Sequence, residues 1–249
     1  SSTHPASSDR IKYLEEIIEQ KPSTFSTTNQ KIKNQYEYSL AKLGAFIRKP
    51  KDTLNMVQNS DKNELTLLSK TIALHRKPAP KEALKTIKKL IEIKGTTPYL
   101  LELLGQIHLD VGKIDKAIEA FSQASAFAPK EPSFLIWLGI SHLALENREN
   151  DQLALEVLKK AHRMDPINPR LLRYLAIAYA RNENYGQAAL KMAEHSLVFG
   201  NFKAAMMHAN KAITLLNSQS FELRRASDIL EISNQIGVDL SIGPFMGFI

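Results

Sequence analysis

Residues 101–129 read LELLGQIHLDVGKIDKAIEAFSQASAFAP, and their pattern of small and large side chains returns in residues 135–166, LIWLGISHLALENRENDQLALEVLKKAHRMDP. In both segments large apolar residues stand three or four positions apart, which is the spacing of one face of an α-helix. A polar stretch divides each segment into two such helices. A proline closes the second helix, because proline disfavours helical geometry in the residue before it. The sequence therefore predicts two successive helix pairs.

The matching positions extend to a third copy. The marked residues are Leu101, Leu104, Gly105, His108, Ala117, Phe121, Ala124 and Pro129 in the first copy; Leu135, Leu138, Gly139, His142, Ala154, Leu158, Ala161 and Pro166 in the second; and Leu172, Leu175, Ala176, Tyr179, Ala188 and Met192 in the third. Small residues let paired helices approach, and larger neighbours fill the grooves between them. This is the pattern of the tetratricopeptide repeat (TPR). We predict an all-α TPR-type solenoid, a superhelix of antiparallel helix pairs with extra N-terminal helices and a C-terminal capping helix.

The spacing of the copies departs from regularity in two places. Gly105 and Gly139 are 34 residues apart, which is the TPR period, but Ala117 and Ala154 are 37 residues apart. We interpret the additional residues, around 147–151, as an insertion in a polar turn. Further along, the small-residue spacing repeats after only 17 residues. One helix at about residues 186–199 should therefore serve two pairs.

The expected organisation has three parts. Residues 1–60 form the junction and the N-terminal non-repeat helices, at about 9–20, 28–47 and after Pro50. Residues 61–236 form the TPR superhelix, and residues 237–249 form an apolar tail that either docks on the last helix or is disordered. The repeats are about 61–97, 98–131, 132–168 and 169–200, followed by a half-repeat at 201–217 and a capping helix at 220–236; the first is a degenerate copy marked by Leu67, Leu74, Ala83, Ile87 and Leu90.

Composition limits the possible classes of function. An apolar fraction of 43% supports a buried core, and the absence of cysteine removes disulfides, thiolate nucleophiles and cysteine-based zinc sites. The net charge of +7 comes from residues 1–97, which hold 18 basic against 10 acidic residues. The basic helix at 81–94 lacks the interleaved aromatic residues that stack on bases, so we predict no nucleic-acid partner. The longest apolar run, 134–140, is too short for a transmembrane segment.

No catalytic or metal-binding constellation is evident. Of the seven histidines, only His142 has a carboxylate four residues later, Glu146, and this pair lacks a third ligand nearby. His108 and His142 occupy the repeat position that an aromatic residue usually holds, so partial burial between helices is expected. No glycine-rich phosphate loop occurs either. We predict no catalytic residue, no metal site and no cofactor in this chain, and no enzymatic activity of its own.

The first helix of each pair should line the concave surface of the solenoid. The expected groove residues are Tyr99, Glu102, Gln106 and Asp110 from one repeat, Ile136 and Ile140 from the next, and Arg170, Arg173, Ile177 and Arg181 from the third. Such a groove runs from acidic through apolar to basic and suits an extended or partly unfolded polypeptide. The alternative is that these residues are only a solvated surface. The asparagine-and-lysine clamp of some TPR domains is not evident, because Gln106 and Ile140 stand where its polar groups would be.

Four segments resemble one family in particular. They are STHPASSDRI at 2–11, YSLAKLGAF at 38–46, LAIAYARNENYGQAA at 175–189 and LRRASDIL at 223–230. They are similar to segments of BepA-like periplasmic zinc metalloproteases, in which an HExxH protease domain precedes a C-terminal TPR half. The resemblance implies that this chain is such a TPR domain, without the protease domain and its zinc, and that it lies in the periplasm. The implied partners are its own protease domain and unfolded or assembling outer-membrane proteins or their assembly machinery.

The family's catalytic residues have no counterpart, because the sequence contains no HExxH motif. One hypothesis concerns His4, at the junction, which would occupy the open position of the zinc in the protease domain; the alternative is a simple turn at His4 and Pro5. The leading interpretation is a substrate- or partner-recruiting arm of the protease in outer-membrane protein quality control. The alternative is a stand-alone TPR scaffold for complex assembly with no enzyme attached. A third, a nucleic-acid or lipid adaptor using residues 81–94, predicts strongly salt-dependent binding.

Overall fold

The computed structural model describes residue 16, residues 26–58 and residues 63–242. The described part is all-helical, which confirms the predicted fold class. The chain divides into two compact units, residues 1–77 and residues 78–249. The boundary falls inside the segment assigned to the degenerate copy, so the pairing of its two helices stays a prediction. The expected helix at 9–20 and the position of His4 lie outside the described residues.

The first unit contains α2 (Ser26–Ile47), α3 (Pro50–Met56) and α4 (Glu64–Arg76). Both α2 and α3 pack on α4. Pro50 stands at the start of α3, where its missing N–H costs no intrahelical hydrogen bond. Arg76 on α4 donates to the carbonyl oxygens of Ala45, at 3.0 Å, and of Arg48 at the end of α2. The predicted helices at 28–47 and after Pro50 are thus present and joined to α4.

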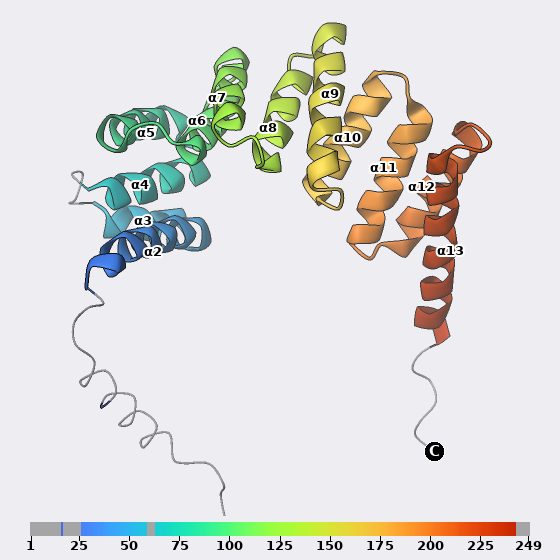
Figure 1. The fold of residues 1–249 in the computed structure, drawn as a ribbon, viewed down its shortest axis with the longest axis horizontal. Coiled ribbons are helices and arrows are strands. Elements are labelled where there is room, and N and C mark those ends of the chain that lie inside the picture. Colours follow the sequence, from blue (N-terminus) through green and yellow to red (C-terminus); the bar gives the residue numbers. More distant parts are fainter. Residues whose placement is uncertain (1–15, 17–25, 59–62, 243–249) are drawn as a thin grey trace, which may run out of the picture. The chain divides into compact units, whose positions relative to one another are not determined.

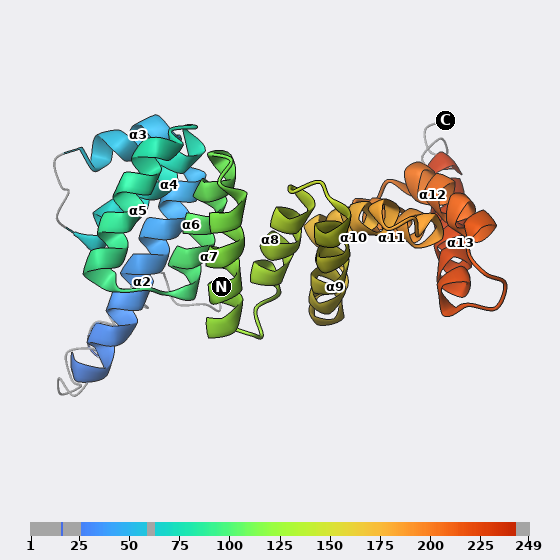
Figure 2. The ribbon, with the colours of Figure 1, turned by 90° about the horizontal axis from the view of Figure 1, so that it is seen from above.

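The second unit is a succession of antiparallel helices (Figures 1 and 2). Its elements are α5 (Pro80–Lys94), α6 (Pro98–Asp110), α7 (Ile114–Phe127), α8 (Pro132–Leu143), α9 (Arg148–Met164), α10 (Pro169–Arg181), α11 (Tyr185–Val198), α12 (Phe202–Leu215) and α13 (Phe221–Ile242). A proline at the first position of each first helix, with Thr97, Glu131 or Asn168 as side-chain cap, marks the starts of α6, α8 and α10. The second helices α7 and α9 end two residues before Pro129 and Pro166.

The glycines of the first helices let the second helices approach closely. A methyl group on Gly105 would lie 2.6 Å from Phe121 Cζ, and one on Gly139 would lie 2.5 Å from Leu158 Cγ. Both Phe121 and Leu158 are fully buried. Each glycine therefore provides the space that the large side chain of the partner helix fills.

The insertion near residue 147 is helical, so its interpretation as a turn was wrong. Asn147 caps α9 by accepting a hydrogen bond from the Asn150 N–H, at 3.0 Å, and the helix begins at Arg148. Because α9 has 17 residues where α7 has 14, the three additional residues form almost one more turn of helix. This turn provides Asn150 and Asp151, whose contacts are described below.

The helix shared between two pairs is confirmed. α11 packs against α10 on one side and against α12 on the other, and α13 covers both α11 and α12. Their common core is rich in alanine, which allows close helix contact; it consists of Ala189, Leu190, Ala193, Ala205, Ala209, Ala212, Ala226 and Ile229. α13 continues as helix to Ile242, beyond the tail boundary expected at Gly237. Residues 243–249 lie outside the described residues.

Candidate polypeptide-binding surface

The acidic end of the predicted groove lies on α6. Tyr99 is 49% exposed and packs edge-on against Phe134, with ring centroids 5.7 Å apart. Glu102 and Gln106 are half-buried, and Asp110, the last residue of α6, is exposed. These four residues follow one another along a single helix and remain accessible to a ligand to different degrees.

The apolar middle of the predicted groove needs one correction. Ile136 on α8 is only 3% exposed and belongs to the core shared with α9 and α10. Its side chain therefore packs inside the unit and does not line a groove. Ile140, one turn later, is half-buried and packs against the edge of the same core. Only Ile140 of this pair retains surface that a ligand can reach.

Arg170 and Trp137 form a contact that the sequence did not predict. The Arg170 guanidinium carbon lies 4.7 Å from the centre of the Trp137 ring, and Trp137 stacks in turn on Phe121, with centroids 5.9 Å apart. A guanidinium held flat on an aromatic face keeps its N–H donors at the edge free for other partners. Arg173, one turn nearer the C-terminus, has its guanidinium carbon 6.0 Å from the Tyr174 ring centre. Both arginines are exposed and directed by aromatic neighbours.

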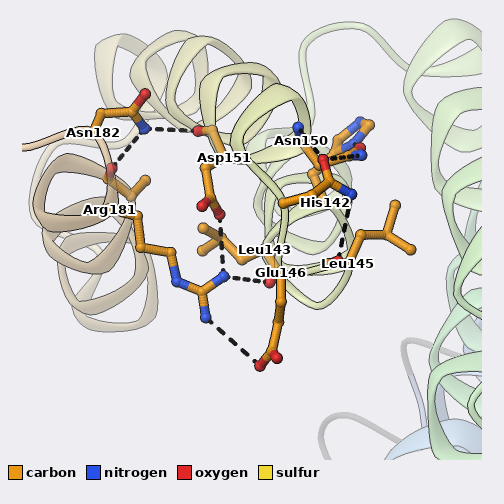
Figure 3. Close-up of polar contacts among 10 residues, drawn as sticks. His142, Leu143, Leu145, Glu146, Asn150, Asp151, Arg181 and Asn182 are labelled. Carbon is orange, nitrogen blue, oxygen red and sulfur yellow. Dashed lines mark hydrogen bonds and ion pairs between the residues drawn. The ribbon is translucent and has the colours of Figure 1, made fainter.

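Arg181, in contrast, is occupied inside the unit (Figure 3). Its Nη1 donates to the Leu143 carbonyl oxygen at the end of α8, at 2.6 Å, and to Asp151 Oδ1 on α9, at 3.1 Å. We call this three-helix contact the Arg181 clip. Its guanidinium joins α8, α9 and α10, so Arg181 is a structural residue and is not available to a ligand in this arrangement.

Two neighbouring contacts complete the junction in Figure 3. Asn182 Nδ2 donates to the backbone oxygens of Asp151, at 2.9 Å, and of Ala178, at 2.8 Å. His142 Nδ1 lies 2.7 Å from Asn150 Oδ1. Both Asn150 and Asp151 belong to the additional turn of α9. The spacing irregularity in the sequence thus corresponds to the residues that fasten the second repeat to the third.

A cavity of about 250 Å³ opens between α10, α11 and α12. Its wall consists of Ala176, Ile177, Ala180, Tyr185, Ala188, Ala189, Met192, His208 and Lys211. Of the predicted groove residues only Ile177 takes part. We call this space the α10–α12 cavity. Here the predicted groove meets a measurable hollow.

The shared helix explains why the cavity forms here. α6 contacts α8 and α8 contacts α10, whereas α12 packs on α11 and α13. Ala176 stands at the repeat position of Gly105 and Gly139, and Met192 at that of Phe121 and Leu158. In this copy the second large side chain lines a hollow and does not fill it. The half-period signal located the irregular pair, but His208 and Lys211 lie on α12 and were missed because no repeat position marks them.

The surroundings of the cavity are electropositive. Burial lowers the pKa of His208, and the charges of Lys211 and His195 lower it further. Burial and the charge of Arg173 likewise lower the pKa of His195. These four groups come from three helices and converge near the cavity. Its wall contains no acidic residue.

A second cavity, of about 240 Å³, lies between α9, α10, α11 and α13 and is polar. Lys191, 8% exposed, donates to Glu194 Oε2 at 2.8 Å, and Glu194 Oε1 is 3.5 Å from Arg225 Nε. Burial and Lys191 lower the pKa of His162, whose Nε2 lies 3.4 Å from Lys191 Nζ. A neutral His162 can accept from the ammonium group. This network pairs its buried charges internally and connects α9, α11 and α13.

The described residues contain no group of three or more histidine, aspartate or glutamate side chains arranged to hold a metal ion. His142, the one histidine with a carboxylate at helical spacing, instead contacts an asparagine. In the same described part, every helix is too short or too polar to cross a membrane.

Acidification is expected to lower the stability of the second unit. Burial, reinforced by Lys116, Lys113 and Lys88 and partly opposed by Glu119, lowers the pKa of His108, which is 8% exposed. A histidine whose folded pKa lies below its unfolded value binds protons more readily in the unfolded chain. Its protonation therefore favours unfolding once the pH falls below about 6.5, the unfolded pKa.

The test compares the wild type with His108→Phe, which restores the usual aromatic residue of this position and removes a buried Nδ1 that lacks a hydrogen-bond partner. Thermal unfolding is followed by circular dichroism at pH 7.5 and pH 5.5. The fall in Tm between the two pH values should be smaller in the variant, by about 2 °C. An equal fall in both proteins would show that His108 does not contribute.

Comparison with known proteins agrees with this architecture. A family model described as tetratricopeptide repeat matches residues 103–150. The structure of MamA from AMB-1 superposes with a TM-score of 0.53 at 16% identity, covering 67% of this chain and 97% of that chain. The structure of YrrB, described as a TPR protein with an unusual peptide-binding site, gives 0.52 at 17% identity, covering 75% and 98%. The chain therefore contains a TPR domain with the fold of TPR solenoid proteins.

Proposed function

We propose that this chain is a polypeptide-binding TPR module and that it recruits substrates or partners for a periplasmic zinc metalloprotease acting in outer-membrane protein quality control. The observation that carries polypeptide binding is the α10–α12 cavity, an open apolar hollow beside the exposed Arg170 and Arg173. Apolar cavities with a few converging polar groups are the usual places of ligand binding. The peptide-binding site named for YrrB, a protein of the same fold, is consistent with this proposal.

The link to a protease rests on the sequence resemblance of residues 2–11, 38–46, 175–189 and 223–230. On this proposal the zinc and the catalytic residues belong to a separate protease domain, and this chain contributes recognition alone. The alternative, a stand-alone TPR scaffold, fits the same fold. The two differ in one observation: whether the natural reading frame runs from an HExxH-containing domain into Ser1.

Crosslinking in intact cells tests polypeptide binding directly. A photoreactive phenylalanine replaces Tyr185, which is 56% exposed at the cavity, or Tyr99 on α6. The control position is Gln152, which is exposed on α9. We expect protein adducts from Tyr185 and Tyr99 that are much weaker from Gln152. Adducts of equal yield from all three positions would contradict a localised binding surface.

Charge reversal provides a quantitative prediction. Replacing both Arg170 and Arg173 by Glu should weaken binding of a crosslinked partner by tenfold or more, because two exposed donors for carboxylates and carbonyls become repulsive. The matched control replaces Lys130 and Lys160 by Glu, since both are exposed and the net charge changes equally. Binding is measured by calorimetry, with circular dichroism to verify folding. An equal loss in both double variants would indicate a general charge effect and contradict the surface assignment.

A further inference from the structure

The size of the α10–α12 cavity limits its occupant. About 250 Å³ is below the range of roughly 300–1,000 Å³ that is usual for small-molecule and cofactor sites. Its wall is made mainly of alanine with Ile177 and Met192, so it offers dispersion contacts and few directional ones. Such a hollow suits one apolar side chain presented by a longer ligand that continues outside it.

The charges around the cavity call for a negative group on that ligand. Lys211 and His208 belong to the wall, and Arg173 and His195 lie close enough to lower histidine pKa values nearby. The charges that shift His195 and His208 are all basic, whereas the pKa values of His108 and His162 also respond to nearby carboxylates. The positive field at the cavity is therefore not balanced by the acidic residues of the described chain.

The geometry of α10 fixes the distance between the two features. Arg173 precedes Ala180, at the far side of the cavity wall, by seven residues, which corresponds to about 10 Å along a helix. An extended polypeptide advances about 3.3 Å per residue, and its side chains alternate between two faces. Residues two positions apart therefore point to the same side, roughly 6.6 Å from each other. Such a pair can place an apolar group in the cavity and a carboxylate at its basic edge.

We propose that the α10–α12 cavity selects an extended polypeptide segment in which a large apolar residue and an aspartate or glutamate stand two positions apart. The apolar side chain enters the cavity between Ile177 and Met192. The carboxylate meets the basic groups formed by Arg173, His208 and Lys211. This inference rests on the proposed polypeptide binding and specifies the chemistry of the segment that is bound.

The test uses synthetic peptides of 12 residues with acetylated and amidated ends, so that no terminal charge contributes. The host is uncharged Gly, Ser and Asn with one central Leu and a fluorescent label. Four peptides differ in one feature each: Asp at both positions two residues from Leu, Asn there, Asp only at the adjacent positions, and the first peptide with Leu replaced by Ala. Binding to the whole 249-residue chain is measured by fluorescence anisotropy.

The peptide with Asp two residues from Leu should bind about tenfold more tightly than the Asn peptide, as expected for one charge-assisted contact. The adjacent-Asp and Ala peptides should both bind more weakly than the first. Equal affinities for the Asp and Asn peptides, or for the two Asp positions, would overturn the inference while leaving polypeptide binding in place. Absence of binding by every peptide would also overturn it, and adducts from Tyr185 in cells would then still support the proposed function.

Variants assign the effect to the cavity. Lys211→Glu should abolish the preference for Asp and create a preference for a Lys peptide, and the exposed Lys160→Glu serves as its control. Ala180→Leu should weaken all peptides by filling the cavity. Because Lys211 is exposed, its replacement leaves the core intact, so the charge test stands even if Ala180→Leu disturbs folding. An unchanged peptide preference in Lys211→Glu would contradict the proposed role of the basic edge.

Discussion

Gly139→Ala is expected to lower the free energy of unfolding by about 1–2 kcal/mol, although alanine favours helix over glycine by about 1 kcal/mol. The added methyl group would lie 2.5 Å from Leu158 Cγ and 2.7 Å from Leu158 Cδ2. Leu158 is fully buried, so it cannot turn away without disturbing its neighbours. The overpacking therefore exceeds the gain in helix propensity. Urea unfolding followed by circular dichroism measures the difference.

The matched control is Gly44→Ala, in the middle of α2. A methyl group there would approach only the side chain of the exposed Arg48, with its nearest atom the guanidinium Nη1 at 2.5 Å, and that flexible end can move aside. Gly44→Ala should consequently be neutral or stabilising by up to about 1 kcal/mol. A stability loss as large as that of Gly139→Ala would mean that close packing against Leu158 is not the cause.

A double-mutant cycle isolates the contact between the two helices. Leu158→Ala alone should cost about 2–5 kcal/mol by leaving a cavity in the core. In the double variant the methyl group introduced by Gly139→Ala occupies part of that cavity and no longer meets a leucine. The two costs should therefore add to more than the cost measured for the double variant. Strict additivity would contradict a direct contact.

The repeat positions could be predicted from the sequence because they encode local and pairwise packing. Gly105 with Phe121 and Gly139 with Leu158 are fixed by a constant spacing, so the small and large residues identify each other without knowledge of the fold. Prolines that begin first helices and follow second helices made the helix ends visible as well. The shared helix α11 was found by the same means, since its small residues match the helices on both sides.

Features that depend on contacts between copies were not visible in the same way. The groove assignment treated every first helix alike, yet Ile136 turned out to be buried because α8 packs against α9 and α10 together. The stacking of Arg170 on Trp137 joins two repeats at no constant spacing. The α10–α12 cavity arises because α12 packs on α11 and α13, which is a property of the assembled helices. None of these has a signature within one repeat.

The additional turn of α9 shows how the same spacing can be misinterpreted. Residues 147–151 are polar, which favours a turn, but Asn147 caps the helix and Glu149 and Asp151 are acidic residues in its first turn, where they favour helix formation. Polarity alone does not distinguish an exposed turn from a capped helix start. The partners of Asp151 decide its role, and they come from α10, 30 residues further along the chain.

Arg181→Met is expected to lower the free energy of unfolding by about 2 kcal/mol, the loss typical of removing hydrogen bonds from a charged donor. The variant leaves the Leu143 carbonyl oxygen without its 2.6 Å donor, and it removes the cation 3.1 Å from the Asp151 carboxylate, whose side chain is only 14% exposed. Arg181→Lys should recover only part of the loss, because an ammonium group lacks the planar fork that serves both acceptors. The control Arg173→Met, on the exposed face of the same helix, should change stability by less than about 0.5 kcal/mol.

The partner of the clip distinguishes a specific contact from a general loss of charge. If Arg181 and Asp151 act together, Asp151→Asn should destabilise the wild type and have a much smaller effect in Arg181→Met. Deleting residues 149–151 shortens α9 by the additional turn and removes both Asp151 and the Asn150 partner of His142. The deletion should therefore cost at least as much as Arg181→Met, even though it restores the regular TPR period. A more stable deletion variant would show that the irregular spacing is tolerated rather than required, and that the Arg181 clip is not what joins the second repeat to the third.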